Sequence, residues 1–111
     1  MQDNEILKNY MKERKYAECI AILKLKIIYY IINAIKQKDS SFDFTTVSDL
    51  ISASNFYLND SSIAYRLDNA LIEETPLKQI EALLNICEEE KIKWIDKTGT
   101  SIKFFSSNLL Q

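Results

Sequence analysis

The chain has 111 residues, which is enough for one domain with one modest core, and its 47% apolar and 27% charged residues are typical of a globular protein. It contains no histidine and a single glycine, which excludes imidazole-based catalysis and glycine-rich phosphate loops. We therefore expect no enzyme activity, no metal and no cofactor, and the net charge of −2 at first argues against a nucleic-acid partner.

The first part of the chain predicts two helices. Asp3 or Asn4 can cap a first helix, and the cluster 13–15 either ends that helix or continues it. A longer helix is predicted over 16–38, with charges at a density that argues against a membrane span. Its first apolar stripe consists of Ile20, Leu23, Ile27, Ile31 and Ala34. Its second stripe, which we expect to form a homodimer interface, consists of Ile22, Leu25, Tyr29 and Ile32.

The middle of the chain predicts short elements that are separated by capping signals. The segment 42–44 is typical of a short strand. Three helices are then expected, one ending near Ala53, one over 61–72 and one over 76–90. Their capping residues are Thr46 in a capping box with Asp49, then Asn59 or Asp60, and finally Thr75 before Pro76.

After residue 90 the spacing of apolar residues changes from helical to alternating. Segments 91–96 and 101–105 predict a two-stranded hairpin, with Gly99 in its turn. In this register Lys93 lies opposite Lys103, a repulsive pair that an anion between the two strands would relieve. A polar tail over 106–111 follows.

The charges are distributed unevenly along the chain. Residues 1–38 carry eight basic and four acidic side chains, residues 39–90 carry two and eleven, and residues 91–111 carry four and one. The two basic ends therefore form the predicted DNA-binding surface, in which lysines supply charge and small hydroxyls donate hydrogen bonds to phosphates. Its candidate residues are Lys8, Lys12, Arg14, Lys15, Lys91, Lys93, Lys97, Thr98, Thr100, Ser101, Lys103, Ser106, Ser107 and Asn108.

Two cysteines, Cys19 and Cys87, lie far apart and form no C-x-x-C motif. Without histidine they are expected to be two buried thiols, not a metal or redox pair. The polar N-terminal residues 1–5 do not resemble a signal peptide, so we expect a reducing, cytoplasmic location.

The succession of helices and the hairpin over 16–105 resembles a winged helix-turn-helix domain. The expected fold is therefore α+β and mostly α: one winged-helix domain over 1–111, with helices within 3–90 and the wing over 91–105. The chain is also similar to the small winged-helix accessory proteins of clostridial conjugative plasmids (TcpK type). This resemblance implies sequence-specific binding of double-stranded DNA at a plasmid transfer origin, beside a relaxase or other conjugation proteins.

The sequence departs from the winged-helix pattern in its two candidate reading helices, 61–72 and 76–90. Both carry carboxylates that would repel phosphates, so we expect the wing and the N-terminal segment to hold DNA at the minor groove. The alternative is a small helical protein-binding module or inhibitor with an acidic surface that mimics DNA. The N-terminal helices also superficially resemble HEPN-type ribonucleases. We do not expect that activity, because the catalytic pattern of those enzymes requires a histidine and this chain has none.

Overall fold

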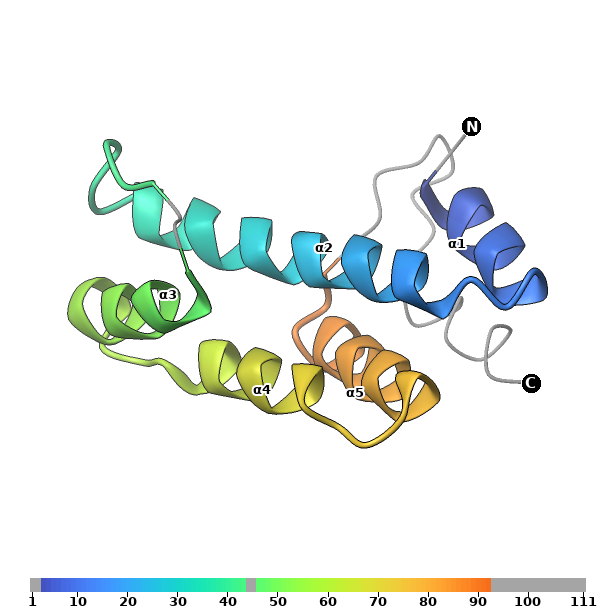
Figure 1. Cartoon of the computed structure of the whole chain (residues 1–111). Coiled ribbons are helices and arrows are strands. Elements are labelled where there is room, and N and C mark those ends of the chain that lie inside the picture. The colour runs from blue at the N-terminus through green and yellow to red at the C-terminus, as the bar shows by residue number, and fades with distance from the viewer. Residues whose placement is uncertain (1–2, 44–45, 93–111) are drawn as a thin grey trace.

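The computed structural model describes residues 3–43 and 46–92, and these residues form helices without any strand (Figure 1). The expected α+β class is therefore wrong, and the described part of the chain is all-α. Its elements are α1 (Asp3–Lys12), α2 (Tyr16–Lys36), α3 (Val47–Ala53), the π-helical turn η1 (Ser54–Leu58), α4 (Ser62–Leu71) and α5 (Pro76–Glu89).

The long helix α2 is the centre of the fold. It contacts α1 near its N-terminal end, and α3, η1, α4 and α5 on the side that Figure 1 shows below it. Its most extensive contact is with α5, which in turn packs against α4. The first predicted stripe of α2 supplies this core, since Leu23, Ile27 and Ile31 are at most 3% exposed. The partners from the other helices include Leu67, Ile80, Leu83, Leu84 and Cys87.

The predicted capping threonines are confirmed at two helices. The Thr46 hydroxyl accepts a hydrogen bond from the Asp49 backbone N–H at 3.0 Å, and the Thr75 hydroxyl accepts one from the Lys78 N–H at 3.2 Å. Pro76 occupies the first turn of α5, as expected.

Two other predicted caps, Asp3 or Asn4 and Asn59 or Asp60, are wrong, although the later helix bounds agree with the prediction within two residues. Asp3 and Asn4 lie within α1 and not before it. Ser61 precedes α4 without a side-chain cap, although the nearby Asp60 carboxylate accepts a hydrogen bond from the Ser62 N–H at 2.9 Å.

The expected strand over 42–44 is also wrong in its described part. Phe42 and Asp43 are irregular, while Phe44 lies outside the described residues. Phe42 instead packs against the core, and its ring meets Tyr57 edge-on with the centroids 6.3 Å apart.

Two helices end in left-handed turns, and the first of them decides that the cluster 13–15 ends α1 and does not continue it. At the end of α1, Arg14 has φ 59° and the Lys15 N–H reaches back to the Tyr10 carbonyl at 2.8 Å. At the end of α5, Lys91 has φ 55° and the Ile92 N–H reaches the Cys87 carbonyl at 2.9 Å. Both are Schellman motifs, in which the residue in the αL conformation stops the helix.

The second motif contradicts the start of the predicted wing. Lys91 is left-handed where the hairpin requires an extended residue, and Ile92 is 7% exposed because it folds back onto the helical core. The alternating pattern of 91–105 is therefore misleading at its first two positions. The remaining predicted wing residues, 93–105, and the tail over 106–111 lie outside the described residues.

Candidate functional site

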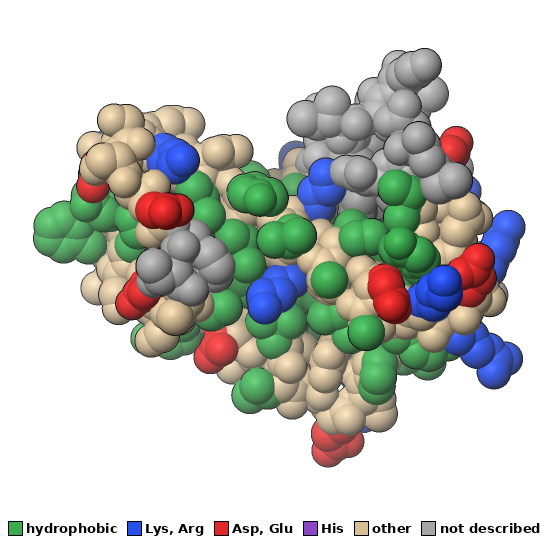
Figure 2. Space-filling model, turned by 45° about the horizontal axis from the view of Figure 1, so that its top comes forward, with side chains coloured by type: hydrophobic (Ala, Val, Ile, Leu, Met, Phe, Trp, Pro, Cys, Tyr) green, Lys and Arg blue, Asp and Glu red, His purple; other side chains and the backbone are tan. Residues whose placement is uncertain are grey.

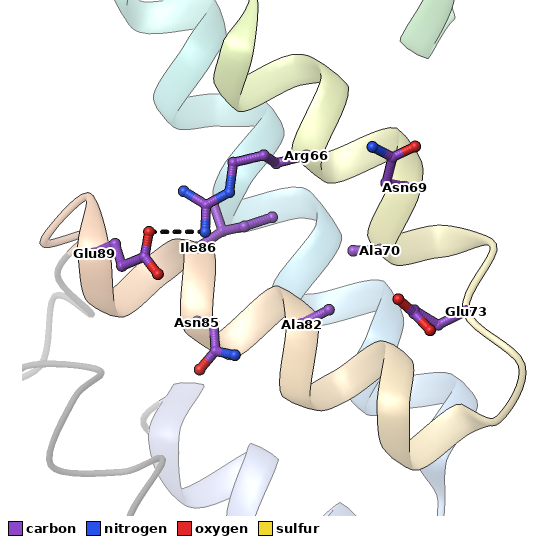
Figure 3. Close-up of a pocket in the computed structure, with 8 residues that line it drawn as sticks. All are labelled: Arg66, Asn69, Ala70, Glu73, Ala82, Asn85, Ile86 and Glu89. Atoms are coloured by element: carbon purple, nitrogen blue, oxygen red, sulfur yellow. Dashed lines mark ion pairs between the residues drawn. The ribbon is translucent and has the colours of Figure 1, made fainter.

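A solvent-open groove of about 240 Å³ lies between α4 and α5 (Figure 3). It exists because small side chains, Ala70 and Ala82, occupy the facing positions of the two helices and leave room above the buried Ile86. Longer polar side chains surround this apolar floor. They are Arg66 and Asn69 from α4, Glu73 from the segment after it, and Asn85 and Glu89 from α5.

One ion pair joins the two walls of the groove. Arg66 Nη2 lies 2.9 Å from Glu89 Oε2, and the side chains are 37% and 62% exposed. An exposed pair of this kind contributes at most about 1 kcal/mol, so a ligand can exchange it for its own contacts at small cost. The two amide groups, Asn69 and Asn85, offer donors and acceptors that suit a polypeptide backbone or an amide side chain.

The part of the chain that forms the groove is strongly acidic, and two of its carboxylates, Glu73 and Glu89, line the groove. Between 62 and 90 the chain carries two cations, and both are already paired: Arg66 with Glu89, and Lys78 with Glu74 at 3.6 Å. Seven carboxylates lie on the same two helices, their connecting turn and the residue after α5. We call the following residues the acidic surface: Asp68, Glu73, Glu74, Glu81, Glu88, Glu89 and Glu90.

The metal-ligating side chains of the described residues are dispersed, and the two thiols are buried. No cluster of three or more metal-ligating side chains occurs in the ranges that the structure describes. Cys19 and Cys87 are free and fully buried, as the sequence predicts. Burial raises the pKa of the Cys19 thiol to about 11 and that of Cys87 to about 12, which makes both poor nucleophiles.

The structure gathers the N-terminal members of the predicted DNA surface at one place. Lys8 and Lys12 lie on α1, and the Schellman turn brings Arg14 and Lys15 beside them; we call this group the basic corner. Lys15 is exposed and its Nζ lies 3.0 Å from the Glu13 carboxylate. This hydrogen bond, with the negative charge of Glu13, raises the pKa of Lys15.

The other predicted DNA-binding residues are not brought to the basic corner by the described structure. Lys91 is exposed at the end of α5. The rest lie outside the described residues: Lys93, Lys97, Thr98, Thr100, Ser101, Lys103, Ser106, Ser107 and Asn108.

The sequence predicts that the helices 61–72 and 76–90 carry carboxylates that repel phosphates, but it does not bring the polar groups Arg66, Asn69 and Asn85 together at one site. The signal that could have combined them is the alanine in each helix, Ala70 and Ala82, because small residues mark where two helices approach closely.

Comparison with known proteins gives no relative: no family model, curated protein or solved structure matches the chain. None of the described helices is both long and apolar enough to cross a membrane.

Proposed function

We propose that the chain is a non-enzymatic protein-binding module that holds a basic polypeptide segment in the α4–α5 groove. The observation that carries this proposal is the composition of the acidic surface, where seven carboxylates accompany two cations that are both already paired. A lysine or arginine of the partner would contact Glu73 or Glu89 at the groove rim, while the apolar floor accepts its aliphatic part.

DNA binding is a second candidate, and the basic corner favours it. Lys12 and Arg14 are exposed there beside the Glu13–Lys15 pair, on an element whose main contact is with α2 and not with the acidic helices. Such a cluster supplies phosphate contacts, which give affinity without sequence information. Base-specific contacts, a transfer-origin target and a relaxase partner would have to come from the chain beyond residue 92.

One binding experiment separates the two candidates. We would measure fluorescence anisotropy with a labelled lysine- and arginine-rich peptide and with a labelled mixed-sequence duplex, at about 50 and about 200 mM salt. The protein-binding proposal expects the peptide to bind, and Glu73→Gln or Glu89→Gln to weaken it by roughly three- to tenfold. Glu5→Gln, at another exposed glutamate on α1, is the matched control and should leave peptide affinity unchanged.

The same experiment can also favour DNA binding over peptide binding. Binding of the duplex but not of the peptide would overturn the protein-binding proposal. In that case Lys12→Ala, Arg14→Ala, Lys93→Ala and Lys103→Ala should each weaken binding of the duplex. The slope of log affinity against log salt should also become shallower by about 0.9 for each phosphate that the variant no longer neutralises.

We also infer that the protein works in the cytoplasm. The support is chemical: Cys19 and Cys87 are free thiols on different helices, which is usual in a reducing compartment.

A further inference from the structure

One side of α2, which borders the core at Ile22 and Ile32, carries a regular row of six residues. Their spacing alternates between four and three positions, which is the repeat of a helix that pairs with another helix. We call this row the α2 stripe, and it consists of Glu18, Ile22, Leu25, Tyr29, Ile32 and Lys36. Its four apolar members are the predicted second stripe.

The described structure leaves the centre of this stripe exposed, whereas Ile22 and Ile32, also predicted for the interface, already pack against the core. Leu25 is 48% exposed and Tyr29 is 58% exposed, and Figure 2 shows hydrophobic side chains in a band across this side of the molecule. Ile32 is 7% exposed and lines a hollow of about 400 Å³ together with Leu25 and Tyr29. The rest of its lining is Ile28, Asn33, Lys36 and Asp43, so that Lys36 shares the hollow with a carboxylate of its own chain. Contiguous apolar side chains of this kind indicate a contact surface.

The ends of the stripe carry opposite charges. Glu18 stands at the N-terminal end of the stripe and Lys36 at its C-terminal end, and both are exposed. Neither forms one of the ion pairs described above, although Glu18 is close enough to Lys15 for its charge to contribute to the raised pKa of that lysine. The six positions form three pairs that are equally spaced on either side of residue 27. The outer pair is an acid and a base, the next pair is two isoleucines, and the inner pair is Leu25 and Tyr29.

We propose that a second copy of this chain binds the stripe, with the two α2 helices antiparallel and a twofold axis near residue 27. In this register each Glu18 meets Lys36 of the second copy, which gives two ion pairs by symmetry. Leu25 packs on Tyr29 of the second copy, and Ile22 enters the hollow beside Ile32. The same surface therefore supplies both sides of the interface, and every position of the stripe finds a complementary one.

Other arrangements of the same helices fit less well. A parallel pair would place Glu18 beside Glu18 and Lys36 beside Lys36, so that like charges repel at both ends. An antiparallel pair displaced by one heptad would leave one end of each stripe unpaired and bury fewer of the apolar residues. Charge complementarity thus selects the antiparallel register and the second copy as the occupant.

The test is a charge swap measured by analytical ultracentrifugation over a concentration series. The unchanged protein should dimerise in the micromolar range, as small interfaces do. Glu18→Lys alone and Lys36→Glu alone should each weaken dimerisation by roughly five- to tenfold at low salt. The double variant E18K/K36E should restore it, because the two pairs re-form with reversed polarity.

A second pair of variants distinguishes dimerisation through the stripe from nonspecific association through other exposed apolar residues. Tyr29→Ser should abolish the dimer, whereas Tyr65→Ser on α4, where the side chain is similarly exposed at 55%, should not. Both residues lie outside the core, and circular dichroism checks that each variant is folded. A monomer at hundreds of micromolar, or a double swap that fails to restore the dimer, would overturn the proposal. So would a stronger dimer in Glu18→Gln, which a parallel pair requires.

Discussion

Three residues in the left-handed region carry backbone strain that a glycine would relieve. They are Arg14, Asn59 and Lys91, with φ between 54° and 59°, while the only glycine of the chain is Gly99. Arg14→Gly should therefore stabilise the fold by about 0.5 to 1 kcal/mol, because glycine adopts this conformation without a Cβ penalty. Urea unfolding measures the gain. Asn59→Gly is the control with a smaller expected gain, since asparagine already tolerates the conformation; a loss of stability in Arg14→Gly would contradict the strain.

A carboxylate at the end of α2 links stability to pH. Asp39 accepts hydrogen bonds from the Ser41 hydroxyl at 2.6 Å and from the Tyr57 hydroxyl at 2.7 Å, and these bonds, with that from the Ser41 backbone N–H, lower the pKa of Asp39 below its usual 3.8. The Asp39 contribution is therefore present above pH 3.8 and is lost as pH falls through the lower, folded-state pKa. The bond to Asp39 raises the pKa of Tyr57, so this contribution is lost at alkaline pH.

The corresponding experiment compares Asp39→Asn with the unchanged protein by urea unfolding at several pH values. The variant should be less stable at neutral pH, and the difference should shrink at acidic pH where Asp39 is protonated in both states. Tyr57→Phe should remove the alkaline part and reduce the acidic part, because Asp39 then keeps only its bonds to Ser41. If Asp39→Asn lost the same stability at every pH, the hydrogen bonds from Ser41 and Tyr57 would not depend on the negative charge of Asp39.

At the scale of elements, α3 and α5 each begin with a threonine cap that holds the first turn. Thr75→Ala should destabilise the fold by about 1 kcal/mol, because the Lys78 N–H would lose its acceptor at the start of α5, the helix most extensively packed on α2. Thermal unfolding gives the difference. Thr75→Ser keeps the hydroxyl and should retain most of the stability; if it behaves like alanine, the cap is not the cause.

The same elements show what the sequence could predict. The caps at Thr46 and Thr75 are predictable because a side-chain hydroxyl before an apolar run is a local signal. The turns at Arg14 and Lys91 are not, since neither residue is the glycine that normally marks a Schellman motif. Alternation after Glu90 therefore predicts a strand beginning at Lys91, where tertiary packing of Ile92 instead turns the chain back.

At the scale of the whole molecule, the candidate site could not be derived from spacing alone. Asn69 and Asn85 come from two helices, and only the packing of α4 against α5 brings them to one groove. The proposed dimer surface is more accessible to prediction because its four apolar residues share one helix and one period. The sequence predicts the charge of the acidic surface from its composition. It does not predict that both cations of this segment form ion pairs with glutamates of the same chain.

The two buried thiols report how the whole molecule opens. Cys19 lies under α1, with its sulfur 4.0 Å from the Leu7 carbonyl, whereas Cys87 lies on α5 in the central contact with α2. Since α1 packs mainly on α2, its release alone would expose Cys19, while Cys87 requires global unfolding. Labelling by iodoacetamide, followed at each cysteine by mass spectrometry without denaturant, should therefore modify Cys19 faster than Cys87.

A variant at the contact between α1 and α2 makes this order testable. Leu7 is fully buried, and Leu7→Ala should cost about 2 to 5 kcal/mol in the packing of α1. It should accelerate labelling of Cys19 strongly and that of Cys87 much less, because the contact between α2 and α5 does not involve α1. Equal acceleration at both thiols would mean that α1 and the central helices unfold as one cooperative unit.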